Sequence, residues 1–310
     1  MMWRANTAVM FIVMSLILMS VGLVVGQLYG NVWIGLIAML ILAVVFNAYA
    51  FFGSKRSALR ANKARIISEA EEPRLYAIVR NVANKAGVPM PEVGISDIHM
   101  PNAFATGRNP KNAAVVATRG LLDLLSDDEL EGVIAHEIAH VKNRDILVMS
   151  VASTMAAVLS FLGRYMMRVV IFGNNRNTYT VIIAIALSIT VPIAAILVQL
   201  GVSRNREYLA DETGAMITGK PRALASALKS IETGVRSDRS DYSNESYESM
   251  WISNPIRKKS PFRRLFSTHP PMNDRISRLN DLAVKMESGQ MPRSEISSKP
   301  SRKGRKPTRI

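Results

Sequence analysis

Residues 126–145 read SDDELEGVIAHEIAHVKNRD, and this pattern predicts one helix. A serine followed three residues later by a glutamate forms a capping box, which opens a helix. His136 and His140 lie four residues apart, so both imidazoles project from the same face. Glu137 lies between them on an adjoining face. The residues before and between the histidines are apolar, so the helix is expected to be buried, and buried imidazoles need polar partners or a metal ion.

The string HEIAH matches HExxH, in which two helix histidines bind zinc and the glutamate acts as base toward the attacking water. We therefore expect one Zn²⁺ per chain, with His136 and His140 as ligands and Glu137 as the catalytic base. The alternative is a pair of surface histidines that bind no metal. The apolar neighbours of the motif argue against that alternative.

A catalytic zinc needs a third protein ligand and keeps one position for water. The longer pattern HExxHxxGxxH is absent, because Asn143 and Ile146 stand where its glycine and third histidine would be. Residues 206–211, REYLAD, place Glu207 and Asp211 four apart on one helix face. Glu207 can serve as a zinc ligand, and Asp211 can accept a hydrogen bond from a ligand histidine and so set its tautomer. Taken alone, this string would describe an exposed acidic helix face.

Four apolar runs surround these motifs. Residues 7–26 and 32–52 carry no charge, and about 20 helical residues cross a hydrocarbon core of about 30 Å. The short link between them predicts a transmembrane hairpin, although the first run could also be a cleaved signal peptide. Residues 146–163 and 181–202 predict a second hairpin, transmembrane or re-entrant. A buried hairpin in a globular domain is the alternative for this second pair.

The distribution of basic residues predicts the orientation of the chain in the membrane. The turn of the first hairpin has none, whereas the residues just after it include Lys55, Arg56, Arg60, Lys63 and Arg65. The positive-inside rule then places both the N-terminus and the residues after the first hairpin in the cytoplasm. We expect a multi-pass protein of the cell membrane whose catalytic domain faces the cytoplasm. Three arginines between the second pair of apolar runs would violate the rule if that pair crosses, and a re-entrant hairpin would remove the conflict.

Composition excludes several protein classes. The chain has 310 residues, no cysteine, a net charge of +15 and 48% hydrophobic residues. Without cysteine there is no disulfide scaffold, cysteine protease or Cys-ligated metal site. Basic residues gather in 257–264 and in the tail 291–310, where either anionic lipid headgroups or water alone can satisfy them. Nucleic acid is not expected as a partner, because no stacking aromatics or binding motif accompany the tail.

HEIAH, an apolar hairpin and REYLAD, in this order, resemble the HtpX-type membrane zinc metalloproteases, which are related to the CAAX prenyl proteases. NAFATG at 102–107 and THPPMNDRI at 268–276 extend the likeness over nearly the whole chain. The resemblance implies an α+β membrane protein. Its mostly helical, gluzincin-like metalloprotease domain would have a small sheet and be anchored by transmembrane helical hairpins.

The same resemblance implies His136, His140 and Glu207 as zinc ligands and Glu137 as general base. It also implies an endopeptidase that hydrolyses membrane or misfolded proteins on the cytoplasmic side, in protein quality control. The partners expected are therefore protein substrates and the lipid bilayer. The alternatives are a prenyl-protein protease, for which four apolar segments are few, and a membrane scaffold with a structural zinc and a basic lipid-binding tail. The scaffold would have no need of Glu137.

Further segments carry weaker predictions. Residues 113–118, AAVVAT, read as a strand, with NAFATG as a strand or turn alongside it. An extended substrate can add to a sheet edge near the zinc helix, or these segments can be plain core strands. His269 or Arg275 could stabilise the oxyanion formed during hydrolysis, or the segment around Pro271 could only cap the next helix.

The chain is expected to divide into five parts. His140 precedes Ile146 by six residues and Glu207 follows Gly201 by six, which for unbroken helices puts both ligands about 9 Å from the membrane. The predicted parts are a transmembrane hairpin (1–53), the first part of the protease domain (54–145), the second apolar hairpin (146–202), the second part of the domain (203–288) and a basic disordered tail (289–310).

Overall fold

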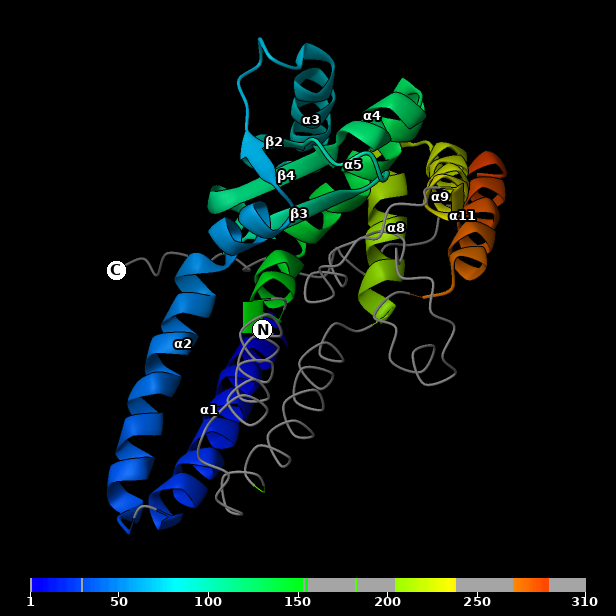
Figure 1. Ribbon diagram of the computed structural model, residues 1–310. Coiled ribbons are helices and arrows are strands. Elements are labelled where there is room, and N and C mark those ends of the chain that lie inside the picture. Colours follow the sequence, from blue (N-terminus) through cyan, green and yellow to red (C-terminus); the bar gives the residue numbers. More distant parts are fainter. Residues whose placement is uncertain are drawn as a thin grey trace, which may run out of the picture.

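The computed structural model describes residues 2–28, 30–152, 154–155, 182, 204–237 and 270–289. Helices dominate this part of the chain, and they surround one four-stranded sheet (Figure 1). This confirms the predicted architecture of a mostly helical protein with a small sheet. The predicted basic tail, His269 and nearly all of the second apolar hairpin lie outside the described residues, and the five-part division stays a prediction.

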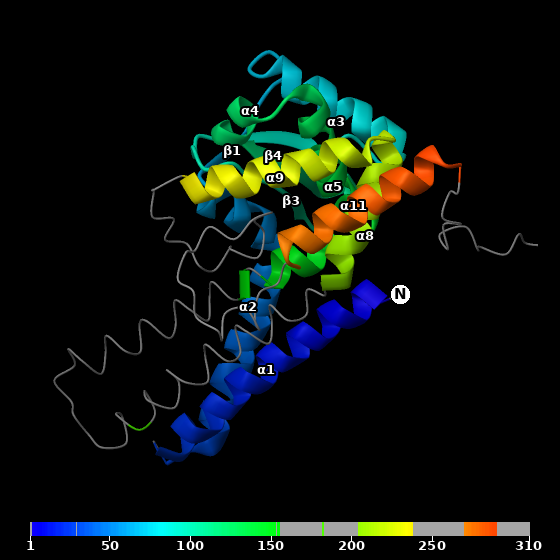
Figure 2. The same ribbon diagram turned by 90° about the vertical axis from the view of Figure 1, so that its right-hand side faces the viewer.

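Helices α1 (Met2–Leu28) and α2 (Val32–Ala61) form an antiparallel hairpin that extends away from the sheet and the other helices (Figures 1 and 2). Asn31 caps α2 by accepting a hydrogen bond from the Ile34 N–H at 3.1 Å. The two helices cross at glycines, and a Cβ on Gly35 would lie 2.2 Å from the Gly22 carbonyl oxygen. Small residues at such a crossing let helix backbones approach closely, as they do in membrane proteins.

Among the described residues, α2 is the one helix long and apolar enough to cross a membrane. Only 11% of its apolar stretch is buried, so most of its side chains face outward. The helix follows the predicted second segment and then continues past Phe52 to Ala61. There it joins the sheet, because Ala58 packs against Phe104 and Val116.

The sheet has the strand order β1-β2-β4-β3. The inner pair, β2 and β4, is parallel, and both outer strands pair antiparallel to their neighbours. The predictions of a strand at AAVVAT and of NAFATG lying alongside it are confirmed by β4 and β3, and β3 forms one edge. The strand bounds are β1 (Ala64–Ile66), β2 (Glu92–Ser96), β3 (Ala103–Gly107) and β4 (Ala113–Thr118).

Helix α5 (Asp127–Lys142) is the centre of the fold. Its residues from Leu130 to Val141 are all buried, because α3, α8, α9 and the sheet pack around it. At its start the Ser126 N–H donates to the Glu129 carboxylate at 3.1 Å, as the capping box predicts. The other helices are α3 (Pro73–Ala86), α4 (Arg119–Leu124), α8 (Arg204–Thr218), α9 (Pro221–Ser237) and α11 (Met272–Glu287), and a short 3₁₀ helix, η1 (Pro110–Asn112), precedes β4.

The expectation of an unbroken helix from His140 into the apolar run at Ile146 is wrong. Helix α5 ends at Lys142, and the chain turns at Asn143 and Arg144. Arg144 has a φ of 62°, a left-handed conformation that ends an α-helix. The distance of about 9 Å, which assumed a continuous helix, therefore does not apply on this side of the site.

Candidate metal centre

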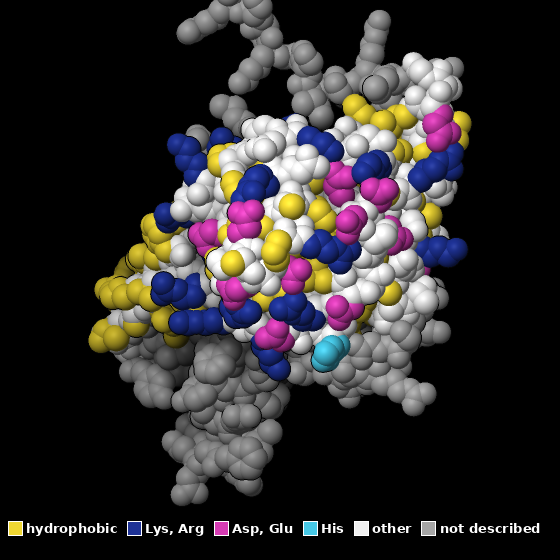
Figure 3. All heavy atoms as spheres, turned by 90° about the horizontal axis from the view of Figure 1, so that it is seen from above, with side chains coloured by type: hydrophobic (Ala, Val, Ile, Leu, Met, Phe, Trp, Pro, Cys, Tyr) yellow, Lys and Arg dark blue, Asp and Glu magenta, His cyan; other side chains and the backbone are white. Residues whose placement is uncertain are grey.

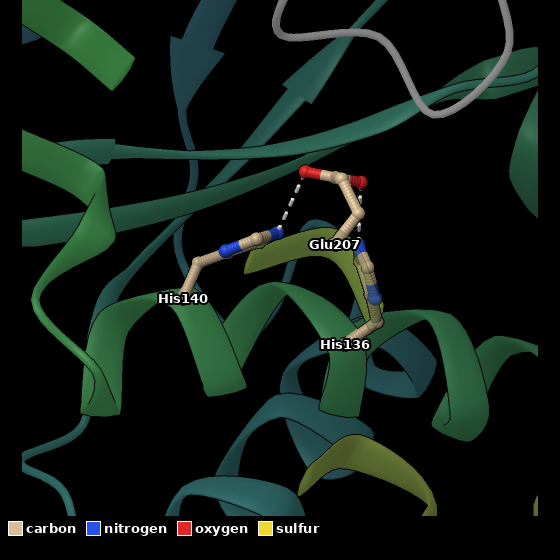
Figure 4. A group of neighbouring side chains, drawn as sticks. All are labelled: His136, His140 and Glu207. Carbon is tan, nitrogen blue, oxygen red and sulfur yellow. Dashed lines mark ion pairs between the residues drawn. The ribbon is translucent and has the colours of Figure 1, made fainter. Parts of the chain in front are cut away.

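Three buried side chains from two helices point toward one position. His136 and His140 come from α5 and Glu207 from α8, and their ligand atoms all lie within 4.8 Å of one another (Figure 4). Glu207 Oε2 is 3.7 Å from His136 Nε2, and Glu207 Oε1 is 3.5 Å from His140 Nε2. All three are at most 2% exposed. The structure thus brings together the three residues predicted as metal ligands.

This donor set fits a metal ion. Two imidazole nitrogens and one carboxylate oxygen form a typical catalytic zinc site that keeps a position open. Donors about 2.1 Å from one ion at tetrahedral angles lie about 3.4 Å apart. Each histidine Nε2 lies at a similar distance from one of the two oxygens of Glu207, and one ligand atom from each residue lies within 4.8 Å of the others. Because polar groups that converge in a buried position need a shared partner, the chemistry of the group favours a divalent metal.

A glycine allows the two helices to approach closely enough. A Cβ on Gly214 of α8 would lie 2.8 Å from the His136 backbone nitrogen and 3.0 Å from the Ala135 carbonyl carbon, both on α5. Only a residue without a side chain fits at this crossing. The close contact holds Glu207, two turns earlier on α8, beside the histidines of α5.

Asp211 contacts the far side of the first ligand, as the sequence predicts. Its Oδ1 lies 2.9 Å from His136 Nδ1. Arg275 of α11 donates to both oxygens of Asp211, from Nε at 2.8 Å and from Nη2 at 2.7 Å. Burial by itself raises the pKa of Asp211, but the Arg275 guanidinium outweighs it and lowers the pKa to about 2. The carboxylate therefore stays ionised behind His136, whose own pKa burial lowers.

The Arg275 side chain is enclosed within the protein and is not exposed to solvent. It is fully buried, and besides Asp211 it lies 3.8 Å from Glu207 Oε2. The Nε and Nη2 groups of Arg275 bind Asp211, which supports a positioning role, and no contact among the described residues tests the oxyanion alternative. Helix α11 begins directly after Pro271, which agrees with the capping alternative.

The second ligand, His140, also has a carboxylate behind it, that of Asp145. Its Nδ1 lies 3.4 Å from Asp145 Oδ2, and the other oxygen of Asp145 accepts from Arg206. Burial lowers the pKa of His140, but Asp145, Glu207 and Glu137 outweigh burial and raise the pKa to about 9. Sequence reasoning missed Asp145 and Arg206. The available signal was a charged residue immediately before an apolar run, a pattern that many apolar helices share without any metal site nearby.

Glu137 lies between the metal ligands and the sheet. Its Oε2 accepts a hydrogen bond from the Ala105 N–H of β3 at 2.7 Å. Burial raises the pKa of Glu137 to about 7, near the value that suits a group which accepts and returns a proton at neutral pH. The edge strand of the sheet therefore runs beside the predicted base.

The model of Peptidase family M48 matches residues 69–283. The chain belongs to peptidase family M48. Protease HtpX homologs of Thermococcus sibiricus and Thermococcus kodakarensis are 44% and 45% identical to it, and both matches cover 92% of this chain and 97% of the relative. The homolog of Tropheryma whipplei strain Twist is 43% identical, over 90% of this chain and 96% of its own length.

A solved structure shares the fold of this M48 chain. The crystal structure of S. mikatae Ste24p aligns with a TM-score of 0.50 and 18% identity, over 85% of this chain and 62% of Ste24p. The resemblance to HtpX-type proteases is thus confirmed, and the protein is a metallopeptidase in which His136 and His140 belong to the HExxH motif. Helix α2, long and apolar enough to cross a membrane, agrees with the expectation of a membrane protein.

Proposed function

We propose that this M48 protein is a membrane-bound zinc endopeptidase that binds one Zn²⁺ through His136, His140 and Glu207. The observation that carries the proposal is the arrangement of three buried ligand atoms within 4.8 Å with a buried, ionisable Glu137 next to them. A zinc ion bound there supplies Lewis-acid polarisation of water and of the peptide carbonyl.

Glu137 acts as general base and then as general acid. It removes a proton from the attacking water and delivers that proton to the leaving amine. The Ala105 N–H holds one carboxylate oxygen of Glu137 in place at 2.7 Å. Asp211 and Asp145 orient the two imidazoles, so each presents Nε2 toward the metal position.

The substrate lies as an extended peptide along the edge strand β3, whose Ala105 and Gly107 N–H groups donate to Glu137 and to Ser150 when no peptide is bound. Strand β3 has one hydrogen-bonded neighbour, β4, and is the edge of the sheet closest to Glu137. Peptides commonly add to such edges through main-chain hydrogen bonds. This arrangement would bring a scissile peptide group beside the base and the metal ligands.

The catalytic domain faces the cytoplasm and acts on membrane or misfolded proteins in quality control. The basic residues at the end of α2 support the orientation. The role in quality control rests on the resemblance to HtpX-type proteases. A second transmembrane hairpin would make the protein multi-pass in the cell membrane. The scaffold alternative gains no support from the site, since a structural zinc has no use for an ionisable glutamate beside its ligands.

The proposal is tested with purified full-length protein, its zinc content and a chelator-sensitive casein assay. Glu137→Gln should keep one zinc per chain and lose at least about 100-fold in activity, because the base is gone while the ligands remain. Glu212→Gln, at an exposed position of α8, is the control and should keep both zinc and activity. Normal activity of metal-loaded Glu137→Gln would exclude Glu137 as the base.

The third ligand needs its own test. Glu207→Ala should lower the zinc content, whereas Glu212→Ala on the same helix should leave it unchanged. Equal zinc content in both variants would remove Glu207 from the site. Glu137→Gln removes the base and should keep the metal, whereas Glu207→Ala removes a metal ligand, so the two variants together distinguish loss of the base from loss of the metal.

A further inference from the structure

The C-terminal end of α2 carries aromatic and arginine side chains on one exposed surface. Tyr49 and Phe52 are 49% and 68% exposed. Arg56 and Arg60 follow Phe52 at intervals of four residues, so they stack along the same helix face, and both are exposed. All four side chains line one groove on α2.

A third arginine reaches this surface from the sheet. Arg108 follows directly after the edge strand β3, and its guanidinium carbon lies 5.6 Å from the centre of the Phe52 ring. A cation at this distance over an aromatic face is attracted by the ring. Phe52 therefore joins an arginine of the protease domain to the arginines of the membrane helix.

The positive charge of this surface is not balanced within the described part of the chain. Lys55, on the neighbouring side of α2, pairs with Glu92 at 2.6 Å. Arg56, Arg60 and Arg108, in contrast, have no carboxylate within ion-pair distance among the described residues. Three exposed guanidinium groups are thus available to an anion from outside the protein.

The surface lies where the apolar part of α2 ends. Exposed apolar side chains precede it along the helix, among them Ile37, Ile41 and Val45. At about 1.5 Å per residue, Arg56 lies about 6 Å beyond Phe52, within a headgroup layer about 5–8 Å thick. The backbone of Arg60 lies about 12 Å beyond Phe52, so its long side chain has to reach back toward that layer. Figure 3 shows dark blue Lys and Arg side chains beside the yellow apolar side chains at the left edge of the molecule.

We propose that Arg56, Arg60 and Arg108 bind the phosphates of anionic phospholipid headgroups, with Phe52 holding Arg108 in place. Guanidinium groups suit phosphate because their fork donates two parallel hydrogen bonds. The groove on α2 also contains Ala48, Tyr49 and Leu59, so apolar side chains lie beside the arginines and can contact the acyl chain. The inference rests on the proposed placement of the end of α2 at the cytoplasmic surface, and it does not depend on peptidase activity.

The test is a lipid titration of the full-length protein followed by native mass spectrometry, with phosphatidylglycerol and phosphatidylcholine as probes. The wild type should bind phosphatidylglycerol more tightly. Substitution of Arg56, Arg60 or Arg108 by Gln should weaken that binding about fivefold for each arginine and leave phosphatidylcholine binding unchanged. Phe52→Leu should weaken phosphatidylglycerol binding as much as Arg108→Gln does. The double variant should bind this lipid no more weakly than Arg108→Gln alone.

A control variant removes the same charge elsewhere. Arg80→Gln, Lys229→Gln and Lys285→Gln together take three exposed positive charges from α3, α9 and α11 and should keep the lipid preference. The proposal is overturned if the triple variant at 56, 60 and 108 keeps the wild-type preference, since another basic segment would then bind the lipid. It is also overturned if the control loses the preference equally. Because the readout is lipid binding, a failure here leaves the peptidase proposal untouched.

Discussion

At the scale of single residues, each histidine of the site has a carboxylate behind it. Asp211 lies 2.9 Å from Nδ1 of His136, and Asp145 lies 3.4 Å from Nδ1 of His140. Each carboxylate in turn contacts an arginine. Such outer partners orient the rings and raise their basicity as ligands. The two histidines nevertheless differ, because the pKa of His136 is lowered by burial and that of His140 is raised to about 9.

We expect Asp211→Asn to lower zinc affinity about 10- to 100-fold, since His136 loses its charged acceptor. The same change leaves the buried Arg275 without its closest counter-charge, which should cost about 3–5 kcal/mol of unfolding free energy. Zinc competition and thermal unfolding measure the two effects. Glu212→Gln, one residue along α8 and exposed, is the control. Unchanged zinc affinity in Asp211→Asn would contradict the positioning role.

Zinc affinity should depend on pH through His140. In the metal-free protein its pKa is raised from 6.5 to about 9, so the proton on His140 stabilises the metal-free fold fully below pH 6.5. That contribution disappears as the pH rises through about 9. Metal binding needs the neutral ring, so the affinity should rise about tenfold per pH unit until that pKa is reached.

The measurement is the zinc dissociation constant from chelator competition between about pH 7 and 8.5. Asp145→Asn should flatten the dependence, because it removes a carboxylate that raises the pKa of His140. An affinity that does not change over this range would show that His140 carries no proton to displace.

At the scale of elements, the site depends on how closely α8 crosses α5. Gly214 contacts the backbone of His136 and Ala135, and Gly132 of α5 similarly lies against the Leu224 backbone of α9. Two glycines thus let α5 pack tightly against two neighbouring helices. Partly buried polar contacts add to this, because Glu131 of α5 accepts from Lys85 of α3 at 2.8 Å and from Lys220 at 2.7 Å.

Gly214→Ala should therefore destabilise the protein and weaken metal binding. In most helix interiors this substitution stabilises by about 1 kcal/mol. Here the added Cβ would lie 2.8 Å from the His136 nitrogen, so α8 must move away, at a cost of about 1–3 kcal/mol. Thermal unfolding and zinc stoichiometry report the change, with Met216→Ala, exposed on α8, as control. A stabilised variant with normal zinc binding would show that the crossing is not tight.

At the scale of the whole molecule, one helix links the membrane to the protease domain. Helix α2 runs without interruption from Val32 to Ala61, and its end packs on β3 and β4 through Ala58. Strand β3 in turn donates to Glu137. The proposed catalytic base is thus connected to the membrane helix through packed elements, which suits a protease that acts on proteins at the bilayer surface.

The proposed orientation predicts labelling from opposite sides of the membrane. The chain has no cysteine, so a single introduced cysteine reports its own position. Asn31→Cys, in the turn between α1 and α2, should react with an impermeant maleimide added to intact cells. Lys63→Cys, after α2, should react only when the membrane is opened. The reverse pattern would place the catalytic domain outside the cytoplasm.

The sequence predicted those features that depend on local periodicity. The four-residue spacing in HEIAH and in REYLAD placed pairs of side chains on one helix face because an α-helix has 3.6 residues per turn. The apolar segment at 32–52 and the strand at 113–118 were predicted from composition alone. The sequence did not predict that α2 extends to Ala61 or that α5 ends at Lys142. Helix ends depend on caps and packing as well as on periodicity.

Only the tertiary structure shows which of these segments lie next to one another. Nothing near Glu207 in the chain indicates how closely α8 crosses α5, and no local pattern brings Arg275 of α11 to Asp211 or the Ala105 N–H to Glu137. Such contacts join residues far apart in the chain, and they form because Gly214 permits close packing and because buried charges require partners. The sequence by itself therefore determined which side chains carry the chemistry, and the packing of α5, α8, α11 and β3 determined how they are held together.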